Sequence, residues 1–266
     1  MRPHGHSVLD VLAGGDVDVV GRVADASNLA LLVRVGAAGL HAIYKPVSGE
    51  RPLWDFPEGT LAAREVGTYL LSAAGRWDIV PETVLRDGPY GPGSVQRWVG
   101  DPLVEQEHPV DLVARDAVGP GWLPVLTGEG ADGRPVVVVH EDSAAMRAVA
   151  VFDAVVNNSD RKGSHLVREG GVLRGFDHGV CLHEDDKLRT VVWGFAGQQI
   201  GDDDLGRIER VRALVTDGTS HLRAALEPLL TPAEVAALEA RCRALLDRAA
   251  YPVPNGEWPA IPWPPL

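Results

Sequence analysis

Residues 17–46 contain three short β-rich runs separated by the turn-forming segments ADASN and GAAG, and this alternation narrows the possible folds. Short β-branched and apolar runs bounded by such turns are typical of strands joined by tight connections. We therefore expect a three-stranded antiparallel meander. Its third strand, LHAIYKP, ends with Lys45 directly before Pro46.

A helix is expected after the meander, within residues 60–75, because apolar residues recur there at helical spacing. Thr60 is a candidate N-cap of this helix, and Gly75 is a candidate C′ residue. A polar loop with aromatic residues, 47–59, connects the third strand to the helix. After the helix, residues 79–102 predict two strands around a Gly/Pro turn.

The composition changes in the second part of the chain. Residues 101–135 are rich in Gly, Pro and acidic side chains, which favours irregular structure. A strand is then expected at 134–140, followed by a buried helix at 141–158 with Asp142 or Ser143 as its cap.

Two or three helices are expected to close the chain. The clearest begins at Thr231, with Pro232 at the first helical position and Glu234 completing a capping box. The acidic run 202–204 is expected at the N-terminus of another helix, where negative charge meets the helix dipole favourably. The Pro-rich tail, 251–266, should be extended.

This element order predicts an α+β fold with two lobes. A β-rich N-lobe with one key helix would occupy residues 1–100, and a mainly helical C-lobe would occupy residues 101–266. The chain should cross between the lobes near residues 96–100.

Composition excludes several classes of partner. The net charge is −12, and phosphate contacts in nucleic acids or anionic membranes need a basic surface instead. The sequence has no apolar run long enough to span a bilayer and no recognisable signal peptide, so we expect a cytoplasmic protein without stable membrane association. Cys181 and Cys242 predict neither a disulfide framework nor a zinc site. The sequence gives no indication of an oligomeric state.

The stretch NNSDRKGSH, residues 157–165, crowds polar groups directly after the expected buried helix. Three other polar residues have the right setting for chemistry: Lys45 at a strand end, Glu65 within the following helix, and Asp177 in a turn after a strand. Each of them alone also suits a solvated surface position or a capped turn.

Together these residues suit phosphoryl transfer, which depends on positioning and charge neutralisation more than on covalent chemistry. A lysine on the third strand can hold nucleotide phosphates, and a glutamate on the next helix can pair with that lysine. Asp160 can accept the proton of an acceptor hydroxyl. Asp177 can hold a metal ion, with His165 assisting.

The Asp160–Arg161 pair, the turn Asp177-His178-Gly179 and the YKP strand end resemble the phosphatidylinositol 3-/4-kinase-like branch of the protein-kinase-like fold, and an actinobacterial subgroup of that branch in particular. The resemblance spans about residues 17–200 in element order. In that family an Asn follows the catalytic Asp by five residues, whereas His165 stands there in this chain.

The resemblance implies ATP as a substrate and Mg²⁺ or Mn²⁺ as the metal. The predicted site residues fall into three groups. The catalytic group is Asp160, Arg161 and Lys162; the nucleotide-binding group is Lys45, Glu65, Ser27, Asn28, Gln96, Trp98 and Val99; and the metal ligands are Asp177 and His165. The adenine is expected near the crossing between the lobes. Asn157 or Asn158 is an alternative source of a metal-binding amide.

Two other functions stay open at this point. The turn ADASN lacks the glycines of a Gly-rich loop, so the chain could be a catalytically silent pseudokinase or nucleotide sensor. A metal-dependent hydrolase is the third hypothesis, with His165, His178 and His183 joining Asp177. If the chain is a kinase, acidic residues 184–186 argue against an anionic lipid and for a neutral or cationic acceptor, which would be a hydroxyl of a soluble small molecule or of a protein. The same acidic run also suits a solvated loop without any role in binding.

Overall fold

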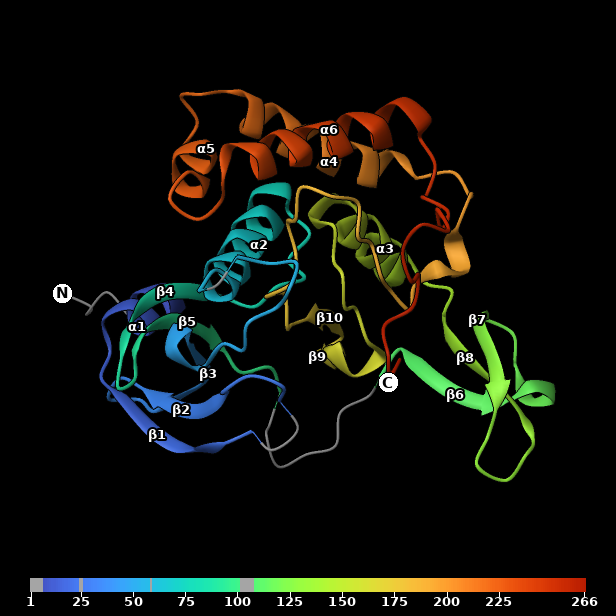
Figure 1. The fold of residues 1–266 in the computed structure, drawn as a ribbon, viewed down its shortest axis with the longest axis horizontal. Coiled ribbons are helices and arrows are strands. Elements are labelled where there is room, and N and C mark those ends of the chain that lie inside the picture. Colours follow the sequence, from blue (N-terminus) through green and yellow to red (C-terminus); the bar gives the residue numbers. More distant parts are fainter. Residues whose placement is uncertain (1–6, 24–25, 58, 101–107) are drawn as a thin grey trace.

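The computed structural model describes residues 7–23, 26–57, 59–100 and 108–266. Its N-terminal part is built on a five-stranded antiparallel sheet with the order β1-β2-β3-β5-β4 (Figure 1). The strands are β1 (Val17–Arg22), β2 (Leu31–Val35), β3 (Leu40–Pro46), β4 (Thr83–Gly88) and β5 (Gly91–Arg97). The predicted meander and strand pair therefore join through β3 and β5.

The two faces of β3 have different roles, because successive side chains of a strand point to opposite faces. Ala42 and Tyr44 are buried in a small core that also contains Leu12 of helix α1 (Val8–Gly14). Lys45 therefore lies on the opposite face. The sequence pattern gave little sign of α1, because seven residues are too few to display a helical period.

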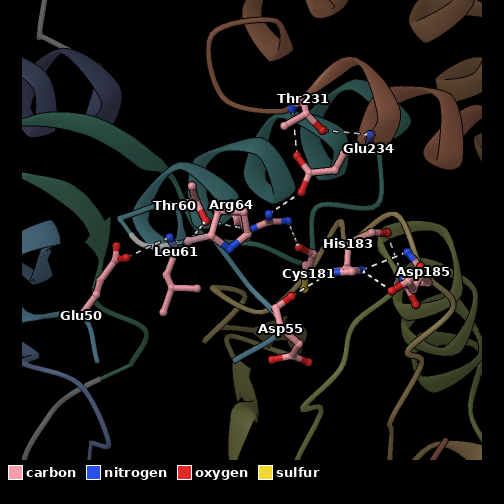
Figure 2. Close-up of polar contacts among 12 residues, drawn as sticks. Glu50, Asp55, Thr60, Leu61, Arg64, Cys181, His183, Asp185, Thr231 and Glu234 are labelled. Carbon is pink, nitrogen blue, oxygen red and sulfur yellow. Dashed lines mark hydrogen bonds and ion pairs between the residues drawn. The ribbon is translucent and has the colours of Figure 1, made fainter. Parts of the chain in front are cut away.

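Helix α2 (Leu61–Gly75) lies where the sequence predicted a helix, but its first turn is capped by a distant side chain. Thr60 occupies the N-cap position, yet its hydroxyl donates to the carbonyl of Pro57 (2.8 Å). The backbone amides of Leu61 and Ala62 donate instead to the Glu50 carboxylate, at 3.2 and 2.9 Å (Figure 2). Glu50 was missed because it precedes the helix by eleven residues and reaches it only when the loop folds back.

Gly75 is not the C′ residue that the sequence suggested. It is the last residue of α2, and Arg76 adopts the left-handed conformation instead (φ 62°). A Cβ on Gly75 would lie 2.1 Å from the ring of Trp77. The glycine therefore permits close packing against an aromatic ring.

The helices of the C-terminal part share one large core with α2. They are α3 (Ala144–Val156), α4 (Asp202–Thr216), α5 (His221–Leu226) and α6 (Pro232–Arg248), with α4–α6 forming a layer along one side of the molecule (Figure 1). Ser143 caps α3, and the predicted capping box at the start of α6 is present. The predicted α+β class, with a β-rich N-terminal part and a helical C-terminal part, is confirmed. No helix in the described ranges has the length and apolarity needed to cross a membrane.

The prediction of irregular structure before residue 135 was wrong. Three strands, β6 (Val110–Ala114), β7 (Trp122–Glu129) and β8 (Pro135–Glu141), form a separate antiparallel sheet in the order β6-β8-β7. The outer strands β6 and β7 are largely solvated and β7 carries a register shift, so neither has a clear apolar alternation. The first residues of this predicted irregular segment, 101–107, lie outside the described ranges.

A short hairpin, β9 (Leu166–Glu169) and β10 (Val172–Gly175), follows the polar loop and is tied to the N-terminal sheet. Arg97, at the end of β5, donates two parallel hydrogen bonds to the Glu169 carboxylate (2.8 and 2.9 Å). Such bidentate pairs restrict geometry strongly. This contact fixes the sheet relative to the hairpin that carries Asp177. The division of the chain at residue 100 stays a prediction.

The C-terminal tail has no regular secondary structure and lies along the C-terminal part (Figure 1). The Ala260 carbonyl accepts hydrogen bonds from the Thr190 amide and the Trp193 indole, at 3.0 and 2.8 Å. The Gly163 amide donates to the carbonyl of Pro265 (2.8 Å). The extended tail thus contacts the polar loop 157–165.

A buried ion pair attaches α2 to α6. Arg64 is 1% exposed, and its guanidinium contacts the Glu234 carboxylate and the carbonyl of Cys181 (Figure 2). The other Glu234 oxygen accepts from the amide of Thr231 at 2.8 Å, closing the capping box. The Glu234 carboxylate therefore caps α6 and also neutralises Arg64, a buried cation on α2.

Replacing Glu234→Ala should destabilise the protein by about 3–5 kcal/mol, because it leaves a buried guanidinium without its partner. Denaturant unfolding followed by circular dichroism measures the change. Glu239→Ala is the matched control, since Glu239 lies on the same helix in a partly exposed pair with Arg243. The control should stay within about 0.5 kcal/mol of the parent. Equal effects of the two changes would contradict the anchoring role of Glu234.

Candidate active site

Three elements bring Lys45, Glu65 and Asp177 together at one end of a cleft. The Lys45 ammonium on β3 lies 2.5 Å from Oε1 of Glu65 on α2 and 2.7 Å from Oδ1 of Asp177 after β10. The Glu65 side chain is 3% exposed, whereas the Asp177 side chain is 51% exposed. The buried Glu65 carboxylate thus holds Lys45 from the protein interior, and the exposed Asp177 carboxylate binds it on the solvent side.

The backbone around Asp177 is shaped for this contact. Asp177 is in the left-handed region (φ 62°), which a residue other than glycine adopts only at an energetic cost. The next amide, that of His178, donates to Oε2 of Glu65 at 3.0 Å. The preceding amide, of Phe176, donates to the carbonyl of His165 at 3.1 Å. Hydrogen bonds on both sides therefore hold Asp177 in the strained conformation that points it into the cleft.

The charges of Lys45 and Asp177 stabilise each other. Burial alone would lower the pKa of Lys45, but the carboxylates of Asp177 and Glu65 outweigh it and raise this pKa above its ordinary value. The Lys45 ammonium in turn holds the pKa of Asp177 well below its usual range. Both groups are therefore ionised across the physiological pH range.

Residues of the polar loop line the same cleft. Asp160, Lys162 and His165 face the Lys45 side, and the turn between β1 and β2 contributes Ser27 and Asn28. The cleft has a volume of about 380 Å³. Eight of the predicted site residues therefore meet at one cavity: Ser27, Asn28, Lys45, Glu65, Asp160, Lys162, His165 and Asp177.

Burial shifts the pKa values of both Asp160 and His165. Burial raises the pKa of Asp160, and the nearby Lys162 ammonium, 3.4 Å from Oδ2, opposes the shift. Burial also lowers the pKa of His165 to about 4, so its ring is neutral at pH 7. Its Nε2 lies 3.4 Å from Oδ2 of Asp177. A neutral imidazole at this position can orient the carboxylate without competing with a cation for it.

Arg161 lies beneath the loop, and its side chain has no exposure. Its guanidinium donates to both carboxylate oxygens of Asp153 on α3 (2.9–3.1 Å) and contacts Nε2 of His178 (2.7 Å). The structure therefore does not place this side chain in the cleft, where a catalytic arginine is expected. Asp153 was missed, although a single carboxylate within the apolar run AVAVFDAVV was a signal that a buried cation would pair with it.

The two amides before Asp160 also support the loop. The Asn157 side-chain amide donates to the backbone carbonyls of His183 and Asp185, at 3.1 and 2.6 Å. The Asn158 side-chain oxygen Oδ1 accepts from the Asp160 backbone amide at 3.0 Å. Because both asparagines are used in this way, neither takes the metal-ligand position that was considered for them.

The residues expected at the adenine do not line the cleft. Gln96 is buried, and its amide donates to the hydroxyl of Thr83 (2.8 Å). Trp98 and Val99 also lie outside the lining. Apolar side chains next to β1 and β2, on β3 and on α2 line it instead: Val23, Leu29, Ala30, Ile43, Leu61 and Ala62. These were missed because an apolar residue has the same sequence signature whether it faces a core or a ligand.

The cleft suits a metal that binds together with a nucleotide. Mg²⁺ usually binds one or two carboxylates with substrate phosphates and water completing its shell, and the exposed Asp177 carboxylate fits that arrangement. The described residues contain no group of three or more His, Cys, Asp and Glu side chains placed to hold a metal.

The structure contradicts the histidine cluster of the hydrolase hypothesis. His183 lies apart from the cleft, between the carbonyl of Asp55 (2.7 Å) and the amide of Asp185 (2.9 Å), as Figure 2 shows. His178 is buried against Arg161. The predicted ligands are therefore separated by their own hydrogen bonds.

Comparison with known proteins gives one strong match. The chain is 46% identical over 264 residues to protein Rv2133c of Mycobacterium tuberculosis, covering 96% of this chain and 94% of that protein. The chain belongs to the family of Rv2133c. No family model matches it, so membership of the phosphatidylinositol 3-/4-kinase-like branch stays a prediction.

A structural comparison also matches this chain to a solved structure. It is the Helicobacter pylori proinflammatory kinase CtkA, with a TM-score of 0.44 and 10% sequence identity. The match covers 90% of this chain and 94% of that one. At this level of similarity the neighbour gives no evidence about activity, which has to be argued from the cleft itself.

Arg161→Lys should destabilise the protein by about 2–4 kcal/mol, because lysine cannot reproduce the bidentate contact with buried Asp153. Thermal or denaturant unfolding tests this. Lys162→Arg, a change at the neighbouring position in the cleft wall, should leave the unfolding free energy nearly unchanged. An Arg161→Lys variant of full stability that lost activity would instead support a direct catalytic role for Arg161.

The raised pKa of Asp160 predicts a pH-dependent effect of Asp160→Asn on stability. Between the ordinary aspartate value of 3.8 and the raised value, the folded state binds more protons than the unfolded state, so stability falls as the pH rises through this range. Asn at this position should therefore raise the melting temperature at pH 7, and the gain should disappear below about pH 3.8. Melting curves of the parent protein and of Asp160→Asn across this pH range test the prediction. A gain in melting temperature that is independent of pH would contradict the burial of a charged carboxylate at position 160.

Proposed function

We propose that this protein is an ATP-dependent phosphotransferase that moves the γ-phosphate to a hydroxyl of a soluble acceptor. The observation that carries the proposal is the Lys45 ammonium, held between Glu65 and Asp177 in a cleft that Asp160 also lines. Phosphoryl transfer needs three different roles, and three carboxylates here suit them. Glu65 is buried and orients the lysine, Asp177 is exposed beside it, and Asp160 has a raised pKa.

The N-terminal sheet provides the proposed nucleotide site. Lys45 would bind phosphate oxygens, and Glu65 would hold the lysine in place. The turn residues Ser27 and Asn28 would face the phosphates, since both lie in the cleft lining near Lys45. The apolar side chains of the lining, such as Ala30 and Ile43, would contact the adenine. This proposed adenine position differs from the one expected near residues 96–99.

Asp160 is the proposed general base. As the acceptor oxygen forms a bond to the γ-phosphorus, its proton passes to the Asp160 carboxylate. The bond from the γ-phosphorus to the bridging oxygen breaks, and ADP leaves with that electron pair. The proton then returns from Asp160 to solvent. Its raised pKa makes this carboxylate a better base than an ordinary exposed aspartate.

Asp177 is the proposed protein ligand of Mg²⁺ or Mn²⁺, with His165 orienting its second oxygen. When bound, such a metal neutralises phosphate charge. The ammonium of Lys45 already contributes the same kind of neutralisation from the other side of Asp177.

A nucleotide sensor without transfer activity is the second candidate, and one observation favours it. Both oxygens of Asp177 have protein partners, Lys45 and His165, so metal binding has to compete with an existing ion pair. A sensor and an enzyme would share nucleotide binding and differ only in the use of Asp160.

Asp160→Asn should keep nucleotide binding and lower phosphate transfer by about 10²–10⁴-fold, because it removes the proton acceptor. Asp177→Asn should instead weaken the metal-dependent stabilisation by nucleotide. Thermal shift with ATP and either Mg²⁺ or Mn²⁺ measures binding, and ADP formation over a panel of hydroxyl compounds measures transfer.

Glu184→Gln, at an exposed acidic position outside the cleft, is the matched control and should change neither measurement. Binding without any transfer in the parent would favour the sensor. Absence of a thermal shift with both metals would contradict both nucleotide-binding functions.

A further inference from the structure

A second cavity of about 420 Å³ adjoins the cleft at the proposed base. The two cavities share four lining residues: Ser27, Asn28, Asp160 and Val180. Molecules occupying both cavities would therefore meet beside the Asp160 carboxylate. This is the arrangement that transfer between a nucleotide and an acceptor requires.

The charges of the second cavity favour an anion. Two arginines, Arg51 and Arg189, belong to its wall. Its carboxylates already have lysine partners, since Asp55 binds Lys187 at 2.7 Å and Asp160 lies 3.4 Å from Lys162. The paired carboxylates leave the two guanidinium groups as the uncompensated charge of the wall.

Both arginines have free donors. Among the described residues the Arg51 guanidinium forms no hydrogen bond or ion pair, and only its backbone amide is bound, to Asn28 at 2.8 Å. Arg189 donates through Nε to the carbonyl of Ser159 at 2.7 Å, which fixes its side chain and leaves its terminal nitrogens for a ligand. Guanidinium forks of this kind match carboxylate and phosphate groups.

The acidic run 184–186 does not alter this balance. None of its three residues belongs to the lining of the second cavity, and all three are exposed. The sequence-based expectation of a neutral or cationic acceptor placed this run at the site. Arg51 and Arg189 are instead the unpaired charges of the second cavity, and they favour an anionic ligand there.

An aromatic surface forms another part of the wall. Trp54, from the loop before α2, is 86% exposed, and Trp258 of the tail lies beside it with ring centroids 6.2 Å apart. The Lys187 ammonium contacts both rings, at 5.1 and 4.8 Å from their centroids. This cation–π contact holds two indole groups that are otherwise costly to expose. Indole faces suit the flat apolar face of a sugar or a similar ring.

We propose that the second cavity binds the acceptor, and that the acceptor is an anionic sugar or cyclic polyol carrying a phosphate or carboxylate. This inference rests on the proposed phosphotransferase. Arg51 and Arg189 bind the anionic group, Trp54 and Trp258 contact the ring, and a free hydroxyl faces Asp160. That hydroxyl gains the γ-phosphoryl group and loses its proton to Asp160, and ADP is the other product.

Binding in the absence of ATP tests the cavity independently of catalysis. The probes are glucose 6-phosphate and glucuronate as anions, glucose and myo-inositol as neutral analogues, and kanamycin as a cation. Tryptophan fluorescence and thermal shift should report binding of at least one anionic class and weaker binding of the neutral and cationic compounds. The two anions separate phosphate from carboxylate recognition.

Arg51→Gln should weaken anion binding by about 10-fold or more, as expected for loss of a hydrogen bond to a charged group. It should leave the thermal shift with ATP unchanged. Arg134→Gln, at an exposed position on the β7–β8 hairpin, is the matched control. Trp54→Ala should reduce the fluorescence change and the affinity for ring compounds.

The outcomes separate the two proposals. Anion binding that depends on Arg51, without any ATP-induced shift, would support the cavity and overturn the phosphotransferase. An ATP-induced shift, with the neutral or cationic probes bound as well as the anions, would overturn the cavity proposal alone. Anion binding that Arg51→Gln leaves unchanged would also overturn it.

Discussion

The Glu65 carboxylate is the contact on which the candidate site depends. One oxygen accepts from the Lys45 ammonium on β3, and the other accepts from the His178 amide beside Asp177. A carboxylate that is 3% exposed needs such partners, because burying it unpaired is costly. The requirement couples the sheet, α2 and the Asp177 turn. None of these elements can shift alone without leaving a buried charge or a buried amide unsatisfied.

Two acids of the cleft are each next in sequence to a fully buried arginine. Arg64 precedes Glu65 and binds Glu234 of α6, while Arg161 follows Asp160 and binds Asp153 of α3. In both places the arginine attaches the backbone to the helical core, and the neighbouring acid is turned toward the cleft. Buried ion pairs contribute little net stability when they replace apolar packing, but they specify geometry when both partners are kept. This specification explains why charged groups are buried on the core side of the site.

The reach of sequence reasoning follows from the range of the interactions. Local signals placed β3, α2, α3 and the Thr231 capping box correctly, because periodicity and caps are written in neighbouring residues. Order along the chain also brought Lys45, Glu65 and Asp177 into one group. Two contacts were missed, since each requires the chain to fold back: the capping of α2 by Glu50 and the pairing of Arg161 with Asp153. Strands β6 and β7 were missed for another reason: they are too solvated to show alternation.

The distribution of lysine connects the two cavities. The chain contains 25 basic Lys and Arg residues, of which only Lys45, Lys162 and Lys187 are lysines. Each lies within 4 Å of an aspartate near the cleft or the second cavity: Asp177, Asp160 and Asp55, respectively. An ammonium is a compact charge that can change partners, whereas a guanidinium is suited to fixed bidentate contacts. The lysines therefore neutralise carboxylates beside the two cavities, and the buried arginines hold the framework. In a chain with a net charge of −12, Arg51 and Arg189 belong to a wall whose carboxylates are paired with lysines. Such a local positive charge attracts anions despite the negative net charge of the chain.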